Sequence, residues 1–370
     1  MSGSELRQLH EQAGARFEQI NGAELVSHYS AGVSSEYEAL TRTVAILDLT
    51  CRSRICLTGA DRTRFLHGQV TNDVNQLKPG QGCYAALVTA KGKIESDFNI
   101  FCLENELLLD FEPGLAQHVI ARFEKFIIAD DVQVIDVSAD YGLLSLQGPS
   151  SAAVLNEFAP SLMLPASPLS FTKFDDSGQE SYCMNVSRVG LPGFDLFRPM
   201  AGIADSLQKL RIIAEKHHGR LCGWEALEIA RIEAGIPRFG KDMDETNLAS
   251  EAGIEARAIS YSKGCYIGQE VISRIRAFGQ VAKALRGFRL QSDATSLPAK
   301  GDKILAGDKE VGYITSATRS PILQAGIALG YVRKEHNAEG TQLVVAAGDS
   351  RIPAQIISLP FVAPGSLATK

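Results

Sequence analysis

The chain has 370 residues, of which 45% are hydrophobic, 22% charged and 7% aromatic, a composition typical of an ordinary globular protein. This composition excludes a disordered, collagen-like or coiled-coil chain, and the length suggests two or three domains. Because 37 basic residues stand against 43 acidic ones, the formal net charge is −6 and no overall positive field draws the chain to nucleic acid or anionic lipid.

The N-terminal segment and the cysteines indicate the cellular compartment. The opening run, MSGSELRQLHEQAGARFEQ, lacks the apolar core of a signal peptide, and no later stretch reaches the roughly 18 unbroken apolar residues of a membrane span. The seven cysteines are an odd number without a C-x-x-C pair, which argues against disulfides and a self-contained zinc site. We therefore expect a cytoplasmic protein without a membrane or metal site, in which six cysteines are small buried residues.

A weak internal repeat indicates two related α+β units. Residues 55–66 can be laid over residues 144–155, and each segment has the pattern of a strand, a glycine turn and a helix, with Gly59 and Gly148 at the turns. Other patterned segments follow in each half. They predict a hairpin over 82–101 that turns at Lys91-Gly92, a helix over 115–127, two strands within 181–197, and helices over 204–217 and 224–234.

The pattern changes from about residue 284. Short β-rich runs follow one another at near-even spacing, separated by Gly and Asp, which predicts a small antiparallel barrel, closed or nearly so. The sequence therefore predicts an α+β protein in three parts: a first unit over 1–140, a second over 141–279, and a C-terminal β-barrel over 280–370.

Cys265 lies in the run KGCYIGQE, residues 263–270. Its two glycines and the plausible helix from Gln269 would place Cys265 near a helix N-terminus, where free amides and the helix dipole stabilise a thiolate. Lys263 would add a cation if its side chain folds back. The run indicates either a reactive thiol or a buried structural cysteine in a loop that needs its glycines.

Arg231 occupies an unusual position on the helix predicted from residue 224. It shares one helical face with Leu227, Ala230 and Ala234, so a cation lies on an apolar stripe. An isolated buried charge is costly, so Arg231 must be paired or must face a pocket. The alternatives are a salt bridge to Glu228, three residues back, and donation to a ligand.

The octapeptide KGCYIGQE resembles the signature of the YgfZ family, the folate-binding, iron–sulfur-associated relatives of the glycine-cleavage T-protein, an aminomethyltransferase. Further segments agree in order along the chain: GADRTRFLHGQVTND at 59–73, KGKIESD at 91–97, RIEAG at 231–235 and EAGI at 251–254. The resemblance runs from about residue 45 to the barrel. It implies two related α/β (ferredoxin-like) units around a central opening for tetrahydrofolate, with the β-barrel packed against them.

The resemblance also implies roles for individual residues. Asp97 matches the T-protein Asp that assists transfer of a methylene from an aminomethyl carrier to folate N5, while Ser96 replaces the acid before it. A solvated hairpin acid is the alternative for Asp97. By the same resemblance Cys265 and Lys263 are catalytic, and the residues expected to bind folate are Arg231, Glu233, Thr71, Asn72, Gln269 and Tyr266.

Two departures from the T-protein shape the predicted function. The T-protein run GYTGE is replaced by SRVGLPGFD at 187–195, without the pterin-binding Glu, which argues against ordinary aminomethyl transfer, and Cys265 adds a thiol that the T-protein lacks. We predict a tetrahydrofolate-binding protein that supports assembly or repair of iron–sulfur clusters, with folate and iron–sulfur client or assembly proteins as its partners. The alternatives are a folate-dependent aminomethyltransferase or demethylase, and a folate-gated adaptor without chemistry.

A locally basic segment lies between residues 263 and 289, where six basic residues stand against Glu270 alone. Such a strip could meet a polyglutamylated folate tail, an acidic protein or RNA phosphates, or could be a solvated face between domains. No aromatic alternation suited to base stacking accompanies it, which argues against nucleic acid as a partner.

Overall fold

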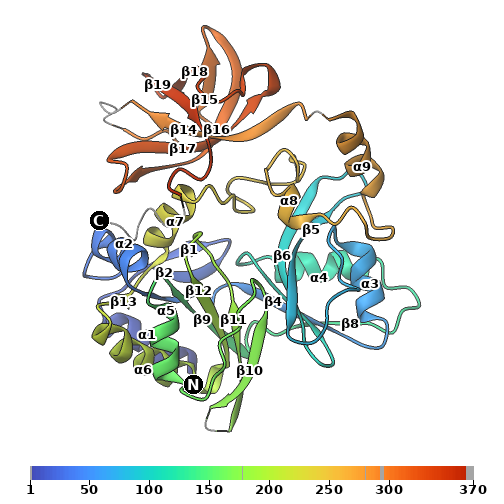
Figure 1. Ribbon diagram of the computed structural model, residues 1–370, viewed down its shortest axis with the longest axis vertical. Coiled ribbons are helices and arrows are strands. Elements are labelled where there is room, and N and C mark those ends of the chain that lie inside the picture. Colours follow the sequence, from blue (N-terminus) through green and yellow to red (C-terminus); the bar gives the residue numbers. More distant parts are fainter. Residues whose placement is uncertain (1, 177, 280, 292–295, 364–370) are drawn as a thin grey trace.

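The computed structural model describes residues 2–176, 178–279, 281–291 and 296–363. It is an α+β protein in which two mixed units lie side by side beneath a closed, six-stranded antiparallel barrel (Figure 1). The predicted fold class, with its C-terminal barrel, is confirmed.

The first unit is built on an antiparallel sheet of order β5-β6-β7-β4-β8. Its central hairpin turns at Lys91-Gly92 as predicted, because Gly92 adopts a positive φ of 73°. Apolar side chains of β4, β6 and β7 pack against α3 and α4 to form one core. The bounds of these elements are β4 (Ser53–Thr58), α3 (Arg62–Gln69), β5 (Gln81–Val88), β6 (Ile94–Cys102), β7 (Leu107–Phe111), α4 (Ala116–Glu124) and β8 (Gln133–Asp136).

The second unit is built on a sheet of order β10-β11-β12-β9-β3-β13. Helices α5 and α6 pack on it, and α1 and the hairpin β1-β2 lie with them. The bounds are α1 (Ser2–Gln12), β1 (Arg16–Ile20), β2 (Ala23–His28), α2 (Val33–Arg42), β3 (Ala45–Asp48), β9 (Tyr141–Gln147), α5 (Ser151–Phe158), β10 (Phe171–Asp176), β11 (Gln179–Asn185), β12 (Gly193–Pro199), η1 (Met200–Gly202), α6 (Ile203–Lys216) and β13 (Arg220–Leu221).

The sequence predicts that the N-terminal residues belong to the first unit, residues 1–140, but in the structure they lie with the sheet of the second unit. Strand β3 pairs with β9, with Ile46 opposite Leu146, and Leu6, Val44 and Ile46 lie in the core of the second unit. The described residues up to Asp48 therefore belong with the second sheet. The hydrophobic pattern shows that a strand exists but not which distant strand it pairs with.

The predicted repeat is present in both units. β4 and α3, like β9 and α5, form a strand, a glycine turn and a helix, with φ values of 98° at Gly59 and 120° at Gly148. A Cβ at Gly59 would lie 2.1 Å from the carbonyl oxygen of Asp131, and one at Gly148 would lie 2.6 Å from that of Thr43. Glycine is therefore required at both turns by the close approach of another backbone segment.

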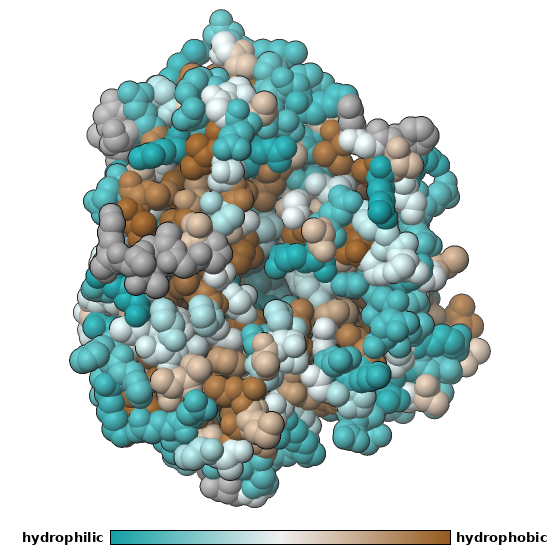
Figure 2. All heavy atoms as spheres, in the orientation of Figure 1, coloured by the Kyte–Doolittle hydropathy of each residue, from teal (hydrophilic) through white to brown (hydrophobic). Residues whose placement is uncertain are grey.

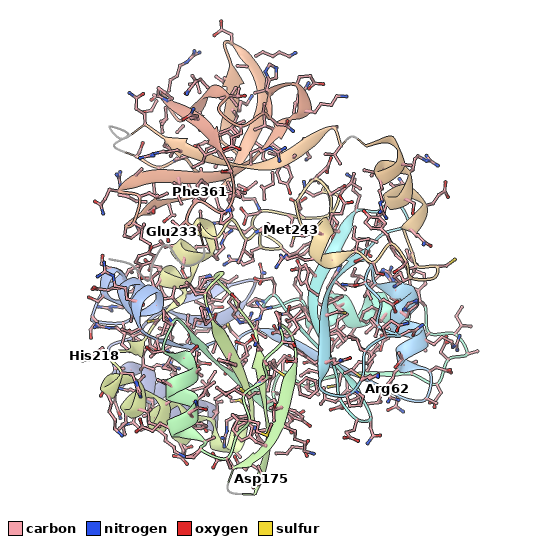
Figure 3. All side chains as sticks on the ribbon, viewed as in Figure 1. Arg62, Asp175, His218, Glu233, Met243 and Phe361 are labelled. Atoms are coloured by element: carbon pink, nitrogen blue, oxygen red, sulfur yellow. The ribbon has the colours of Figure 1, made fainter. Side chains whose placement is uncertain are left out.

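Helix α7 (Trp224–Glu233) lies between the mixed units and the barrel. Glu233, at its end, accepts hydrogen bonds from Tyr37 on α2 and Ser320 on β16, and its backbone carbonyl accepts one from the Phe361 amide at 2.8 Å. Figure 3 shows Glu233 and Phe361 at this junction. The remaining elements are α8 (Glu255–Ala258), α9 (Gln269–Phe278), β14 (Lys283–Leu290), β15 (Lys303–Ala306), β16 (Lys309–Ser320), β17 (Ala325–Arg333), η2 (Lys334–His336), β18 (Gln342–Ala347) and β19 (Ser350–Ile357).

Within the described ranges, no helix has both the length and the apolar character needed to cross a membrane.

Candidate functional site

A cavity of about 490 Å³ lies where the two sheets, α7 and the segment after α7 meet. The first unit contributes polar side chains such as Asp97 and Glu112, the second contributes the loop after β11, and α7 contributes Trp224. The molecular surface has a recess near the centre of the face in Figure 2. The cavity is therefore enclosed by residues that lie far apart in the sequence.

Asp97 is the most unusual acid of this cavity. It lies on β6 opposite Ala86, and its Oδ2 accepts a hydrogen bond from the Tyr84 hydroxyl at 2.8 Å. Its Oδ1 is buried and has no hydrogen-bond partner among the described residues. Desolvation, and then the negative charge of Glu112, raise the pKa of Asp97 to about 6. A carboxyl with these properties can exchange a proton with a bound ligand near neutral pH.

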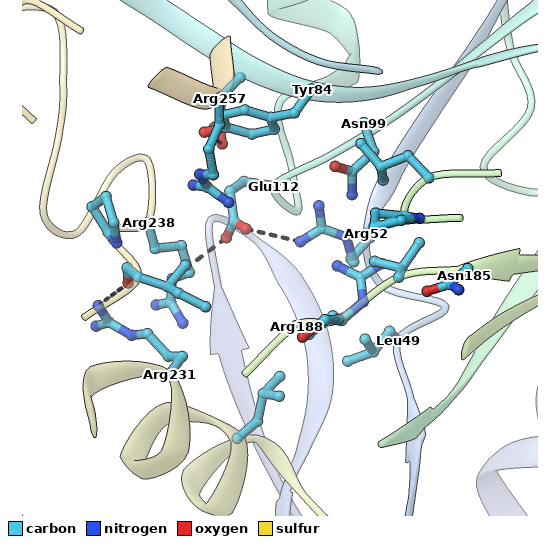
Figure 4. A pocket seen from close by; sticks show the side chains of 18 of the residues that line it. Leu49, Arg52, Tyr84, Asn99, Glu112, Asn185, Arg188, Arg231, Arg238 and Arg257 are labelled. Atoms are coloured by element: carbon cyan, nitrogen blue, oxygen red, sulfur yellow. Dashed lines mark hydrogen bonds and ion pairs between the residues drawn. The ribbon is translucent and has the colours of Figure 1, made fainter. Parts of the chain in front are cut away.

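A series of ion pairs, in which acids and arginines alternate, lies along and behind the cavity. Arg52 bridges Asp110 and Glu112 at 2.8 Å each. Arg238 lies 3.4 Å from Glu112, and Figure 4 shows Glu112 between Arg52 and Arg238. Each residue of this series forms an ion pair with the next: Asp195, Arg188, Asp110, Arg52, Glu112, Arg238, Glu228, Arg231 and Asp242. The series begins on β12, crosses the end of β7 and α7, and ends beside the barrel, so it ties all three parts of the molecule together.

Arg231 lies near the end of this series of ion pairs, beside the barrel. All five of its N–H donors have protein acceptors: Glu228 twice, Asp242, the carbonyl of Ile236 and the hydroxyl of Ser316. The predicted salt bridge to Glu228 is therefore present. Arg231 also lines the cavity, but direct donation to folate does not match its geometry, because every donor is already engaged.

The ammonium of Lys263 has other partners than the predicted one, the Cys265 thiol. Its ammonium donates to the carbonyls of His67, Val70 and Asn72 at 2.6, 2.7 and 2.8 Å, and lies 4.8 Å from the centre of the Tyr266 ring. Burial lowers the pKa of Lys263 to about 8. The side chain does not fold back toward Cys265, because the carbonyls at the negative end of α3 attract it.

Three of the expected folate or catalytic residues line the cavity, namely Asp97, Arg231 and Asn72. The Asn72 amide donates to the carbonyls of Tyr84 and Arg257, at 2.8 and 3.1 Å. The other predicted site residues are not among the cavity-lining residues: Cys265, Lys263, Thr71, Glu233, Tyr266 and Gln269.

The contacts of these other residues explain their positions. The Thr71 hydroxyl donates to the carbonyl of Ala258 at 2.6 Å, and Tyr266 is buried in a hydrophobic cluster beside β5. Gln269 begins α9, and Glu233 holds the junction of α2, α7 and β16. These residues therefore lie around the site and do not line the cavity. The sequence pattern alone does not distinguish residues that pack near a cavity from residues that line it.

Cys265 is exposed, which excludes the buried-cysteine alternative. Helix α9 begins at Gln269 after Gly268, so Cys265 precedes the first turn rather than lying within it. Burial raises the thiol pKa of each of the other cysteines: Cys51, Cys56, Cys83, Cys102, Cys183 and Cys222. Cys265 is thus set apart by its accessibility.

The basic segment over 263–289 does not form one anion-binding face. Lys263 is buried, Arg274 pairs with Glu270 at 2.6 Å, and Arg276 stacks on the Tyr261 ring at 3.8 Å. Lys283 donates to the Tyr313 hydroxyl at 2.9 Å. Most of these charges therefore serve local contacts.

Sequence reasoning missed several cavity residues, among them Tyr84, Glu112, Arg188 and Glu228. One available signal was the i, i+2 spacing of Asp110 and Glu112 at the end of an apolar strand, which turns both acids to one face. Among the described residues, no group of three or more His, Cys, Asp or Glu side chains could hold a metal ion.

Comparisons with known proteins agree with this architecture. Residues 6–263 match the model of the GCVT N-terminal domain, and residues 283–363 match that of the glycine cleavage T-protein C-terminal barrel domain. Aminomethyltransferases of Halalkalibacterium halodurans and Rubrobacter xylanophilus are each 28% identical, covering 97% and 95% of this chain and 97% and 92% of their own. The crystal structure of the glycine cleavage system aminomethyltransferase T from Bartonella henselae has the same fold, with a TM-score of 0.86, 24% identity and 97% coverage of both chains.

Proposed function

The chain belongs to the glycine cleavage T-protein family, and on that premise we propose that it is a folate-dependent one-carbon transferase. It binds tetrahydrofolate in the cavity and transfers a one-carbon unit from an amine to the folate. The observation that carries this proposal is Asp97, a desolvated carboxyl with one unpartnered oxygen and a pKa raised to about 6.

The residues present fit a reduced folate. The cavity volume of about 490 Å³ lies within the range of small-molecule sites. Leu49, Leu169, Val186 and Trp224 line it with apolar surface suited to a flat ring. The unpartnered Oδ1 of Asp97 gives an N–H group of the ligand an acceptor that the protein itself leaves unused.

The chemistry follows from the protonation of Asp97. Tetrahydrofolate supplies a nucleophilic ring amine that accepts the one-carbon unit. At pH 7.5, above its pKa of about 6, Asp97 is mostly ionised, so Oδ1 can accept the proton that the ring amine loses as it bonds to the one-carbon unit. In the same transfer the bond between that unit and the donor amine breaks, and the donor amine leaves. The Tyr84 hydroxyl fixes the orientation of the carboxylate through Oδ2. Glu112, held by Arg52 and Arg238, maintains the charge that tunes this proton affinity.

Calorimetric titration with tetrahydrofolate tests the proposal. We expect a Kd tighter than about 100 μM, which corresponds to roughly −5.5 kcal/mol. No heat at millimolar ligand would contradict folate binding. A lipoyl carrier loaded with an aminomethyl group is the first donor to assay; formation of methylene-tetrahydrofolate identifies an aminomethyltransferase. Retained folate binding without turnover, as the missing T-protein Glu leads us to expect, points to a different amine donor.

A second candidate function is support of iron–sulfur enzymes, which the KGCYIGQE signature suggests. The observation that favours it is the exposed thiol of Cys265, in contrast with the other cysteines, which are buried or half-buried. Folate binding in the cavity and thiol chemistry at Cys265 are separate properties, so both can be tested in the same protein.

Iodoacetamide at neutral pH should alkylate Cys265 before any other cysteine, because burial, complete or partial, limits access to the others and raises their pKa, that of Cys83 to about 12. Mass spectrometry of the alkylated peptides measures the order. Cys265→Ser should lower the activity of iron–sulfur enzymes in cells while leaving tetrahydrofolate affinity unchanged, and Cys102→Ser, outside the cavity, is the matched control. Equal labelling of Cys265 and Cys83, or full client activity in Cys265→Ser cells, would contradict this second function.

A further inference from the structure

The arginines of the cavity are not equivalent. Arg52, Arg188, Arg231 and Arg238 each form an ion pair with at least one carboxylate. Arg257 also lines the cavity, yet no carboxylate partner for its side chain is found in the described parts of the chain. Its charge acts on Asp97 through space and favours the ionised carboxyl, but its N–H groups have no ion-pair partner among the described residues and can serve a ligand.

The Arg257 side chain is exposed, but a stacking contact holds it in place. It lies on α8, and its guanidinium stacks over the Tyr84 ring with 4.5 Å between Cζ and the ring centre. Tyr84 in turn donates its hydroxyl to Asp97, so a single aromatic ring separates Arg257 from the proton-exchanging carboxyl. Figure 4 shows the Arg257 side chain beside Tyr84 at the wall of the cavity. Stacking engages the flat face of the guanidinium and leaves its N–H edge free.

We propose that Arg257 is the carboxylate-binding residue of this cavity. The inference rests on the proposed function and extends it, because it states which part of the ligand is recognised apart from the reacting amine. A guanidinium edge donates two parallel hydrogen bonds to a carboxylate, with a geometry and strength that a lysine does not match. The other cavity arginines are neutralised by protein acids, so a ligand carboxylate is attracted to Arg257.

Two ligands could supply the carboxylate. One is the glutamate end of the folate itself, and the other is the carboxylate of an amino-acid donor whose amine carries the one-carbon unit. Both present the same chemistry to Arg257. An amine held near Asp97 and a carboxylate held at Arg257 would fix the ligand at two points, on either side of the Tyr84 ring.

The test compares Arg257→Gln with Arg276→Gln, a matched control in which an exposed arginine stacks on Tyr261 at 3.8 Å outside the cavity. Because the Arg257 side chain has no hydrogen bond to any residue that the structure describes, we expect Arg257→Gln to fold normally. Calorimetry should show tetrahydrofolate binding weakened about 10- to 100-fold in Arg257→Gln, unchanged in Arg276→Gln, and partly retained in Arg257→Lys. The affinity for 6-methyltetrahydropterin, which has no carboxylate, should not change.

Each outcome decides the inference. A loss confined to tetrahydrofolate assigns the carboxylate to the folate tail. Unchanged tetrahydrofolate binding with a comparable loss of binding of N-methylglycine, used as a non-reacting amino-acid probe, assigns it to the donor. Equal weakening of tetrahydrofolate and the methylpterin, or no effect on any ligand, would overturn the role of Arg257. Absence of tetrahydrofolate binding in the wild-type chain is a separate result, which contradicts the proposed function before any variant is compared.

Discussion

Replacing Asp97 with Asn is expected to lower the rate of one-carbon transfer to tetrahydrofolate by about 10²- to 10⁴-fold, the usual contribution of a positioned acid or base. Asparagine keeps the shape of the side chain and can still accept the Tyr84 hydrogen bond through its amide oxygen. It cannot take up a proton near neutral pH. The loss should therefore appear in kcat, with tetrahydrofolate affinity changed much less, in a methylene-transfer assay with an active amine donor.

The same substitution should raise stability at neutral pH. The folded-state pKa of Asp97, about 6, lies above its ordinary value of 3.8. Between these values the folded chain binds more protons than the unfolded chain, so the contribution of Asp97 to stability falls as pH rises through that window. Above pH 6 the ionised carboxyl costs up to about 3 kcal/mol, and Asp97→Asn removes this cost. A residue kept at such a cost is retained for function rather than for folding.

Denaturant unfolding at pH 7.5 and at pH 4 measures this effect. The Asp97→Asn midpoint should exceed that of the wild type at pH 7.5, and the difference should shrink at pH 4, where Asp97 is protonated in the folded wild type. Asp349→Asn, on the exposed turn between β18 and β19, is the control and should change neither activity nor midpoint. Full transfer activity in Asp97→Asn, or a midpoint below that of the wild type at pH 7.5, would refute the assignment.

Features that depend on local pattern were predictable from the sequence. The alternation of side chains and the Lys91-Gly92 pair predict the β5-β6 hairpin, and the glycines at 59 and 148 predict the two strand–turn–helix units. The near-even spacing of short β-rich runs predicts the barrel. Asp97 could be placed in the site because its hairpin is local and its motif resembles that of the T-protein.

Features that depend on distant partners were not predictable. Arg52 and Glu112 are 60 residues apart, and Arg188 and Asp110 are 78 apart, so their ion pairs leave no periodic trace in the sequence. The same reason explains the misplaced roles of Lys263 and Arg231. For Arg231 the sequence correctly indicated a cation that must be paired, but several of its acceptors come from the segment after α7 and from the barrel. For Lys263 the acceptors are carbonyls at and just after the end of α3, 191 to 196 residues away in the chain.

Removing Arg231 should be among the most destabilising single changes in the chain. Arg231→Met leaves Asp242, which is 2% exposed, without its cation and removes one of two arginines from Glu228. Breaking a buried ion pair by deleting one partner costs about 3–5 kcal/mol, because the remaining charge stays buried. Since Asp242 also accepts hydrogen bonds from Thr315 and Ser316 on β16, both at 2.6 Å, the loss should loosen the barrel from α7.

Two comparisons separate this network effect from a general sensitivity to charge. Arg274→Met removes an exposed i, i+4 pair with Glu270 and should cost less than about 1 kcal/mol. Adding Asp242→Asn to Arg231→Met should recover part of the lost free energy of unfolding, because the uncompensated carboxylate is then neutral. Denaturant unfolding measures each variant, and limited proteolysis between α7 and β14 reports loosening of the barrel. If Arg231→Met costs no more than Arg274→Met, the ion pairs of Arg231 do not hold the three parts of the molecule together.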